Sequence, residues 1–186
     1  GTTNTIVRYN VSVNDGIREY QIRDNTFFSP LFHISGPVNN TMIYNNLFIV
    51  PAKINNNIDN TLIQMDNWGG PWPVDTKFSN NIFLVETKGD FVWGSAVSTT
   101  FDNNAFKGEF DNFPTNSNKS LFFDPLLINK LARGSGFDVL TNFMLQKDSP
   151  CIGAGIKIDN NGGKDLFGNL LMNSNPPSIG VHEYVK

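Results

Sequence analysis

MIYNNLFIV, at residues 42–50, is one of four related phrases in this chain. The other three read IVRYNVSV at 6–13, KFSNNIFLV at 77–85 and TFDNNAFKG at 100–108. Self-similarity at a period of this size is typical of a stacked repeat. The phrases are rich in β-branched and aromatic residues and are bounded by Asn, Gly and Asp, which favours strands. They therefore predict an all-β fold built from the coils of a parallel β-helix.

The asparagines of the phrases form one column when the copies are aligned. The column holds Asn10, Asn46, Asn81 and Asn104, at steps of 36, 35 and 23 residues. Stacked Asn side chains form hydrogen-bonded ladders between parallel strands. The regular recurrence favours a structural asparagine ladder over an active site.

A second strand series lies between these phrases. It reads SPLFHISG at 29–36, NTLIQMDNW at 60–68 and GDFVWGS at 89–95. Aligning the apolar positions puts Phe32, Ile63 and Phe91 in one column, so that His33 falls beside Gln64 and Ser35 beside Asp66. Residues in one column should lie about 4.8 Å apart per turn. A third short strand is predicted in the connections, for example around residues 19–23.

Composition excludes several classes of function. Charged residues make up 17% of the 186 residues and the net charge is −3, so the basic patch that nucleic-acid binding requires is absent. No apolar run approaches the roughly 20 residues of a membrane span. The single cysteine, Cys151, allows no internal disulfide and is interpreted as a small buried hydrophobe. Oligomeric state stays open.

The repeat fades after residue 108, so residues 1–108 are expected to form the coils. Residues 109–186 are expected to form the last partial turns and a C-terminal cap of the same domain, since a solenoid has to cover its open end. The chain begins without Met. We expect a processed or truncated product that lacks N-terminal coils.

The tail carries a family resemblance. It contains DPLLIN at 124–129, LQKDSPCIGAG at 145–155, GGKDLFGN at 162–169 and a closing IGVHEY at 179–184. These motifs resemble the C-terminal end of right-handed parallel β-helix repeat proteins of the pectate-lyase-like superfamily. The upstream repeats resemble the last coils of that family.

The resemblance implies a bacterial protein that is secreted, periplasmic or on the cell surface and that acts on polysaccharide or oligosaccharide. The expected function is the C-terminal part of a polysaccharide lyase or glycoside hydrolase, with catalytic groups partly upstream of this chain. The alternatives are a glycan-binding module without catalysis and a structural stalk or cap. Fold alone does not separate them.

Three ionisable residues are the catalytic candidates: Asp15, His33 and Asp66. Two carboxylates across a groove are the usual means of glycoside hydrolysis, which makes Asp15 and Asp66 the acid and base candidates. His33 is assigned as a proton carrier or a substrate contact. The alternative for Asp15 is a turn residue before Gly16. The alternatives for His33 and Asp66 are a harmless solvent-facing position and a turn next to Asn67.

Substrate binding is assigned to five further residues: Arg8, Gln64, Trp68, Trp72 and Trp93. Flat indole rings suit the apolar faces of sugars. Trp68 and Trp72 lie on a Gly/Pro loop, whereas Trp93 also fits a core position. The segment DNNGGKDLFGN at 159–169 superficially resembles a calcium loop but lacks the alternating carboxylates and the terminal Glu. No metal site and no cofactor are therefore expected; calcium is the alternative left open, without a motif that supports it.

Overall fold

A computed structural model describes residues 1–15, 27–52, 59–134, 136–171 and 176–185. Within them the chain forms two six-stranded sheets in which every pair of neighbouring strands is parallel. The all-β prediction is confirmed, and the helical content is one α-turn and one 3-10 turn. The elements are β1 (Thr2–Thr3), β2 (Ile6–Arg8), β3 (Val11–Val13), β4 (Phe32–Ser35), β5 (Val38–Tyr44), β6 (Leu47–Val50), β7 (Thr61–Asp66), β8 (Val74–Ser79), β9 (Ile82–Val92), β10 (Thr100–Asp102), β11 (Ala105–Asp111), β12 (Ser117–Asn118), α1 (Phe137–Leu140) and η2 (Thr141–Phe143).

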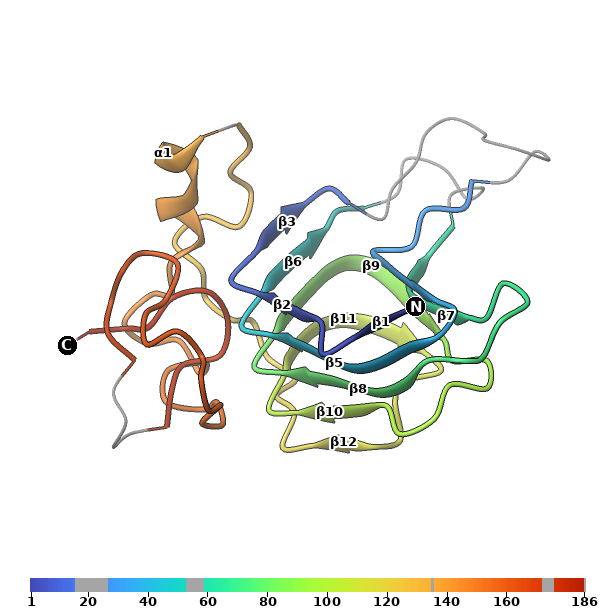
Figure 1. Ribbon diagram of the computed structural model, residues 1–186. Coiled ribbons are helices and arrows are strands. Elements are labelled where there is room, and N and C mark those ends of the chain that lie inside the picture. Colours follow the sequence, from blue (N-terminus) through green and yellow to red (C-terminus); the bar gives the residue numbers. More distant parts are fainter. Residues whose placement is uncertain (16–26, 53–58, 135, 172–175, 186) are drawn as a thin grey trace.

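Strands one repeat apart in the sequence are neighbours in space, and they make three stacks (Figure 1). The first stack runs β1 and β2, β5, β8, β10 and β12. The second contains β3, β6 and the first parts of β9 and β11. The third contains β4, β7 and the second parts of β9 (residues 88–92) and β11 (residues 109–111). The stacking thus continues beyond residue 108, because β12 pairs with β10 and Leu121 bridges to Ala105.

The predicted register of the third stack is confirmed. Phe32 pairs with Ile63 and Ile63 with Phe91, and the same register places His33 opposite Gln64 and Ser35 opposite Asp66. The position near residues 19–23 where a further strand was predicted lies outside the described residues.

Each asparagine phrase is two strands and not one, which corrects the prediction. The backbone turns from the first stack to the second at the residue before the ladder asparagine. That residue has a positive φ in all four copies: Tyr9 (53°), Asn45 (51°), Asn80 (55°) and Asn103 (52°). Asn tolerates this left-handed conformation better than other residues with a Cβ. The repeated Asn–Asn pair therefore marks the corner at which the backbone turns from the first stack to the second.

The asparagine ladder is present, with buried Asn side chains hydrogen bonded to one another. Asn46 donates to Asn81 Oδ1 from its backbone N (3.1 Å) and from Nδ2 (2.9 Å). Asn10 donates to Asn46 in the same way, and Asn81 to Asn104. The second proton of each inner amide reaches a backbone carbonyl, such as that of Ile43 for Asn81 (2.8 Å). The ladder satisfies backbone groups that the corner removes from the sheets.

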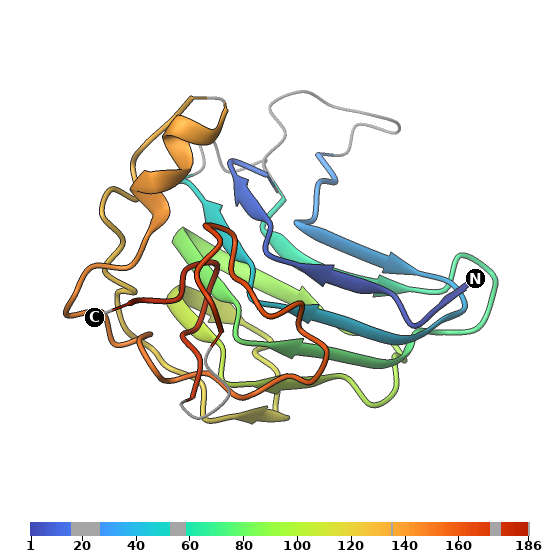
Figure 2. The same ribbon diagram turned by 60° about the vertical axis from the view of Figure 1, so that its left-hand side comes forward.

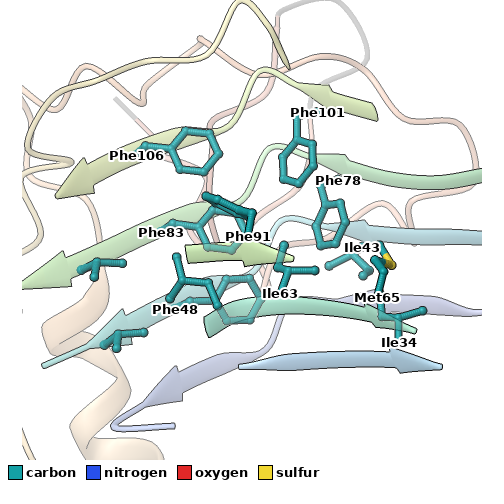
Figure 3. Close-up of a cluster of buried hydrophobic side chains, with 13 residues drawn as sticks. Ile34, Ile43, Phe48, Ile63, Met65, Phe78, Phe83, Phe91, Phe101 and Phe106 are labelled. Carbon is teal, nitrogen blue, oxygen red and sulfur yellow. The ribbon is translucent and has the colours of Figure 1, made fainter. Parts of the chain in front are cut away.

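The core between the three stacks is apolar and largely aromatic (Figure 3). Phe78 stacks on Phe101 with ring centroids 4.5 Å apart, and Phe83 stacks on Phe106 at 5.1 Å. Ile34, Ile63 and Met65 line the same interior from the third stack. Because side chains alternate along a strand, the side chains that flank Ile34 on β4 and the one between Ile63 and Met65 on β7 point outward.

The described residues that follow Leu121, called the C-terminal part below, pack beside the sheets. They lie against the outward side of the second stack (Figures 1 and 2). Leu47, Ile49 and Ile82 meet Cys151 and Ile179 there in a second apolar cluster. Strand β6 is accordingly buried on both faces.

The corner asparagines hold this C-terminal part in place. Asn45 Nδ2 donates to the carbonyl of Gly180 (2.8 Å), and Asn103 Nδ2 donates to that of Ala154 (2.7 Å). Asn80 makes two bonds with Ile156, one from Nδ2 to the carbonyl and one to Oδ1 from the backbone N, each of 2.8 Å. One asparagine of each pair thus serves the ladder inside, and the other anchors the segment outside.

Candidate functional site

The outward side of the third stack carries the most distinctive polar group of the described residues. Ile34 and Met65 point into the core, so His33, Ser35 and Asp66 lie on the opposite face of β4 and β7. His33 Nε2 contacts Asp66 Oδ2, and the hydroxyl of Ser35 donates to Asp66 Oδ1. Strand register is the cause, since Ser35 is the direct partner of Asp66.

Both members of the pair are accessible from solvent. The side chains of His33 and Asp66 are 22% and 20% exposed. This exposure leaves room for a ligand to approach without a rearrangement of the sheet.

Two aromatic rings flank the imidazole. Phe28 approaches His33 edge to face with centroids 5.1 Å apart, and Trp68 does so at 5.2 Å. Trp68 is 79% exposed and has a positive φ of 38°. Its indole is a flat apolar surface next to a polar pair, which is the combination that binds sugars.

The electrostatics of the pair favour an ionised Asp66. Burial by itself would raise the pKa of Asp66, but hydrogen bonds from Ser35 and His33 outweigh it and hold the pKa below its usual value. An ionised carboxylate only accepts hydrogen bonds, so it selects the imidazole tautomer that carries its proton on Nε2. In a neutral ring, His33 Nδ1 then carries the lone pair and can accept a hydrogen bond or a proton from a ligand.

Ser35 supports the carboxylate in this arrangement. Its hydroxyl proton is donated to Asp66 Oδ1 and not to the imidazole. A serine nucleophile requires its proton to be taken by the base, so the geometry assigns Ser35 to the orientation of Asp66.

Two predicted site residues lie elsewhere. Asp15 follows β3 of the second stack and accepts a hydrogen bond from Ser12 Oγ (2.6 Å). Arg8 of the first stack donates to the Tyr44 hydroxyl (3.2 Å) and to the Asn160 carbonyl (3.4 Å). Among the described contacts none joins either residue to the His33–Asp66 pair.

Gln64 is next to the pair by register, as the partner of His33. The other two tryptophans lie further along the chain. The ring of Trp72 covers Gly94, where a Cβ would lie 2.1 Å from the indole. Trp93 stacks on Phe91 at 5.3 Å and donates its indole N–H to the carbonyl of Asn112 (2.9 Å). Trp93 is thereby tied into the fold, whereas Trp68 has a free face.

Ser35 and Phe28 belong to the site but were not among the predicted residues. Ser35 could have been predicted from the sequence, because the repeat alignment places it beside Asp66. Phe28 could not have been predicted in this way, because it lies in the connection before β4 and contacts His33 only in the folded protein.

The described part of the chain contains no cluster of three or more His, Cys, Asp or Glu side chains that could hold a metal ion. It also contains no helix with the length and apolar character needed to cross a membrane.

No protein-family model matches the chain, and no curated protein matches it. The resemblance of the tail and repeats to pectate-lyase-like proteins therefore stays a prediction. Fold and site together define an all-β protein of stacked parallel strands, with a histidine–carboxylate pair on an outward sheet face.

Proposed function

We propose that this chain is part of a right-handed parallel β-helix and that it acts on polysaccharide, with the outward face of β4 and β7 as the glycan site. Stacks of parallel strands related by one repeat support the fold proposal. The resemblance noted above adds a secreted or cell-surface protein with further coils upstream.

One observation carries the functional proposal: the imidazole of His33 is held by Asp66 and flanked by the exposed ring of Trp68. A sugar ring stacks on the indole, while Gln64 supplies an amide that donates to and accepts from hydroxyls. His33 Nδ1 takes up the proton that the reaction releases, and Asp66 stabilises the imidazolium that results.

Binding without cleavage is the second candidate, and a specific observation favours it. Hydrolysis uses two carboxyl groups, one of them protonated. Asp66 is ionised, and no hydrogen bond or ion pair of the described residues brings a second carboxyl group to the pair. If catalysis takes place, its remaining group comes from outside this set.

Incubation with a panel of polysaccharides and mass spectrometry of the products tests the proposal. Products with an added water indicate hydrolysis, and unsaturated products without it indicate elimination. Asp66→Asn is expected to lower turnover by roughly 100-fold or more, because Asn no longer orients the imidazole as a base. Asp15→Asn is the control and is expected to leave turnover unchanged.

Binding and product formation discriminate the candidates. Binding that Trp68→Ala weakens, without any product, would support the binding module. Neither binding nor product across the panel would refute the proposal for this chain.

A further inference from the structure

We propose that the glycan bound on this face is one without acidic groups. This inference rests on the proposed function and names its substrate class. It follows from the charges of the third-stack face, meaning the outward side chains of β4, β7 and the second parts of β9 and β11.

Four carboxylates and one ammonium group make up the charges of this face among the described residues. The carboxylates belong to Asp66, Asp90, Glu109 and Asp111, and the ammonium group to Lys88. Their outward direction follows from alternation with Met65, Gly89, Phe91 and Phe110, which are buried or pack against the core. Leaving His33 aside, the four carboxylates and one ammonium group give three net negative charges.

The ammonium group of Lys88, the one cation among the described residues of this face, is paired with a carboxylate. Lys88 Nζ lies 2.7 Å from Asp111 Oδ2. The hydrogen bond to Asp111 is the main cause that raises the pKa of Lys88, and the charges of Glu109 and Asp90 add to it. Lys88 therefore lies among carboxylates, and an anionic ligand would compete with Asp111 for its ammonium group.

The connection at 16–26 lies outside the described residues. Its sequence contains Arg18, Glu19, Arg23 and Asp24 and has no net charge. The connection at 53–58, which precedes β7 in the chain, also lies outside the described residues and contains Lys53.

An acidic polysaccharide would bring about one negative charge per sugar onto this face. At the ionic strength of a cell, charges within about 8 Å still repel one another. Sugar hydroxyls, in contrast, are attracted to carboxylates, because an O–H group donates a short, charge-assisted hydrogen bond to a carboxylate oxygen. The same carboxylates thus disfavour uronate or sulfate groups and favour an uncharged glycan.

Binding to glycan pairs that share a backbone and differ in charge tests the inference. Suitable pairs are homogalacturonan with its fully methyl-esterified form, and carboxymethyl with hydroxyethyl cellulose. Affinity electrophoresis or calorimetry at about 20 mM and 500 mM salt would measure the affinities. We expect the uncharged member of a bound pair to bind at least about 10-fold more tightly at low salt, with a smaller difference at high salt because salt screens the repulsion.

The variant Asp111→Asn frees Lys88 and removes one negative charge from the face. It should strengthen binding of the acidic member, and it should weaken binding of the uncharged member only to the extent that one charge-assisted hydrogen-bond acceptor is lost. Asp138→Asn is the matched control, because Asp138 lies on α1, away from this face. That variant should change neither affinity.

The possible failures are distinguishable. Equal or tighter binding of the acidic member, at a site that Trp68→Ala weakens, would overturn the inference and leave the proposed function intact. Absence of binding to every glycan would overturn the proposed function itself.

Discussion

The four ladder asparagines differ in their surroundings. Asn46, Asn81 and Asn104 are fully buried, whereas Asn10 at the N-terminal end of the ladder is exposed. A buried amide that loses its partner costs about 1–3 kcal/mol, but an exposed one finds water. Position along the ladder therefore sets the importance of each side chain.

Asn81→Ala should destabilise the protein strongly. The change removes the acceptor for Asn46 and the donor to the carbonyl of Ile43, both in the interior. We expect the free energy of unfolding to fall by about 3 kcal/mol or more, measured by denaturant unfolding. Asn10→Ala is the control and should cost less than about 1 kcal/mol; equal losses would argue against a cooperative ladder.

A column of threonines in the first stack has buried hydroxyls without hydrogen-bond partners. Thr41 of β5 pairs with Thr76 of β8. Thr99 directly precedes the β10 residue that pairs with Lys77, so it continues the column next to Thr76. The three Oγ1 atoms are buried and have no hydrogen-bond partner among the described residues. Such groups have paid for desolvation without a compensating bond.

Thr76→Val should therefore stabilise the protein. Valine keeps the shape and removes the unpaired hydroxyl, so we expect the free energy of unfolding to rise by about 1 kcal/mol. Thr61→Val is the matched control, since the Thr61 hydroxyl donates to Asp59 (2.8 Å) and its loss should destabilise. A lower midpoint for Thr76→Val would show that this hydroxyl has a partner.

At the level of elements, the C-terminal part is joined to the second stack by apolar packing and by the corner asparagines. Asn80 is the most informative of these, because one side chain makes both bonds to Ile156. Its backbone also requires positive φ, which glycine adopts without strain. Asn80→Gly therefore separates the corner from the anchor.

We expect Asn80→Gly to preserve the stacked strands and to loosen the C-terminal part. Hydrogen exchange at the Ile156 amide should accelerate by roughly 10-fold or more, as expected for the loss of about 1.4 kcal/mol of local stability. Asn40→Gly, at another position with positive φ (54°), loses only an exposed bond to Asn4 and should leave this exchange rate unchanged. An unaltered rate in Asn80→Gly would mean that apolar packing alone holds the segment.

The stability of the C-terminal part should depend on pH through His182. Its Nδ1 accepts a hydrogen bond from the backbone N of Leu145 (3.1 Å), which requires a neutral ring with the proton on Nε2. Burial lowers the pKa of His182, and the charge of Asp165 opposes this only in part. The unfolded chain thus binds a proton at a higher pH than the folded protein does.

The stabilisation from His182 should be complete above about pH 6.5 and be lost as the pH falls through the lower pKa of the folded state. Denaturant midpoints between pH 7.5 and 5 would measure it. In His182→Gln, which cannot titrate, this part of the pH dependence should disappear. A histidine contribution that grew toward low pH would contradict the assignment of a neutral ring.

At the scale of the whole molecule, the rate of Cys151 labelling tests whether the two apolar clusters open together. One cluster is the core between the stacks, and the other, which contains Cys151, lies between the second stack and the C-terminal part. Its side chain is 1% exposed between the second stack and the C-terminal part, and burial raises the thiol pKa to about 12. Thiolate is the reactive form, so labelling requires that this interface open. We expect labelling at least about 1000-fold slower than in denaturant, consistent with a stability of several kcal/mol.

Asn80→Gly should accelerate labelling of Cys151 while circular dichroism of the strands stays unchanged. Labelling that accelerated only together with loss of strand signal would show that the protein opens as one cooperative unit.

The repeat by itself determined the strand columns, because register in stacked parallel strands follows the spacing of apolar residues. The pairings of His33 with Gln64 and of Ser35 with Asp66 were readable in this way, and so was the asparagine ladder. Only the tertiary structure decided that His33 Nε2 of β4 meets Asp66 of β7, that Asp15 and Arg8 lie elsewhere, and that the corner asparagines anchor the C-terminal part. Alignment places residues along a column, but backbone turns and the docking of non-repeating segments decide which face each side chain occupies and what it contacts. Those decisions depend on contacts between residues distant in the chain, such as Asn45 with Gly180, and a local pattern does not contain them.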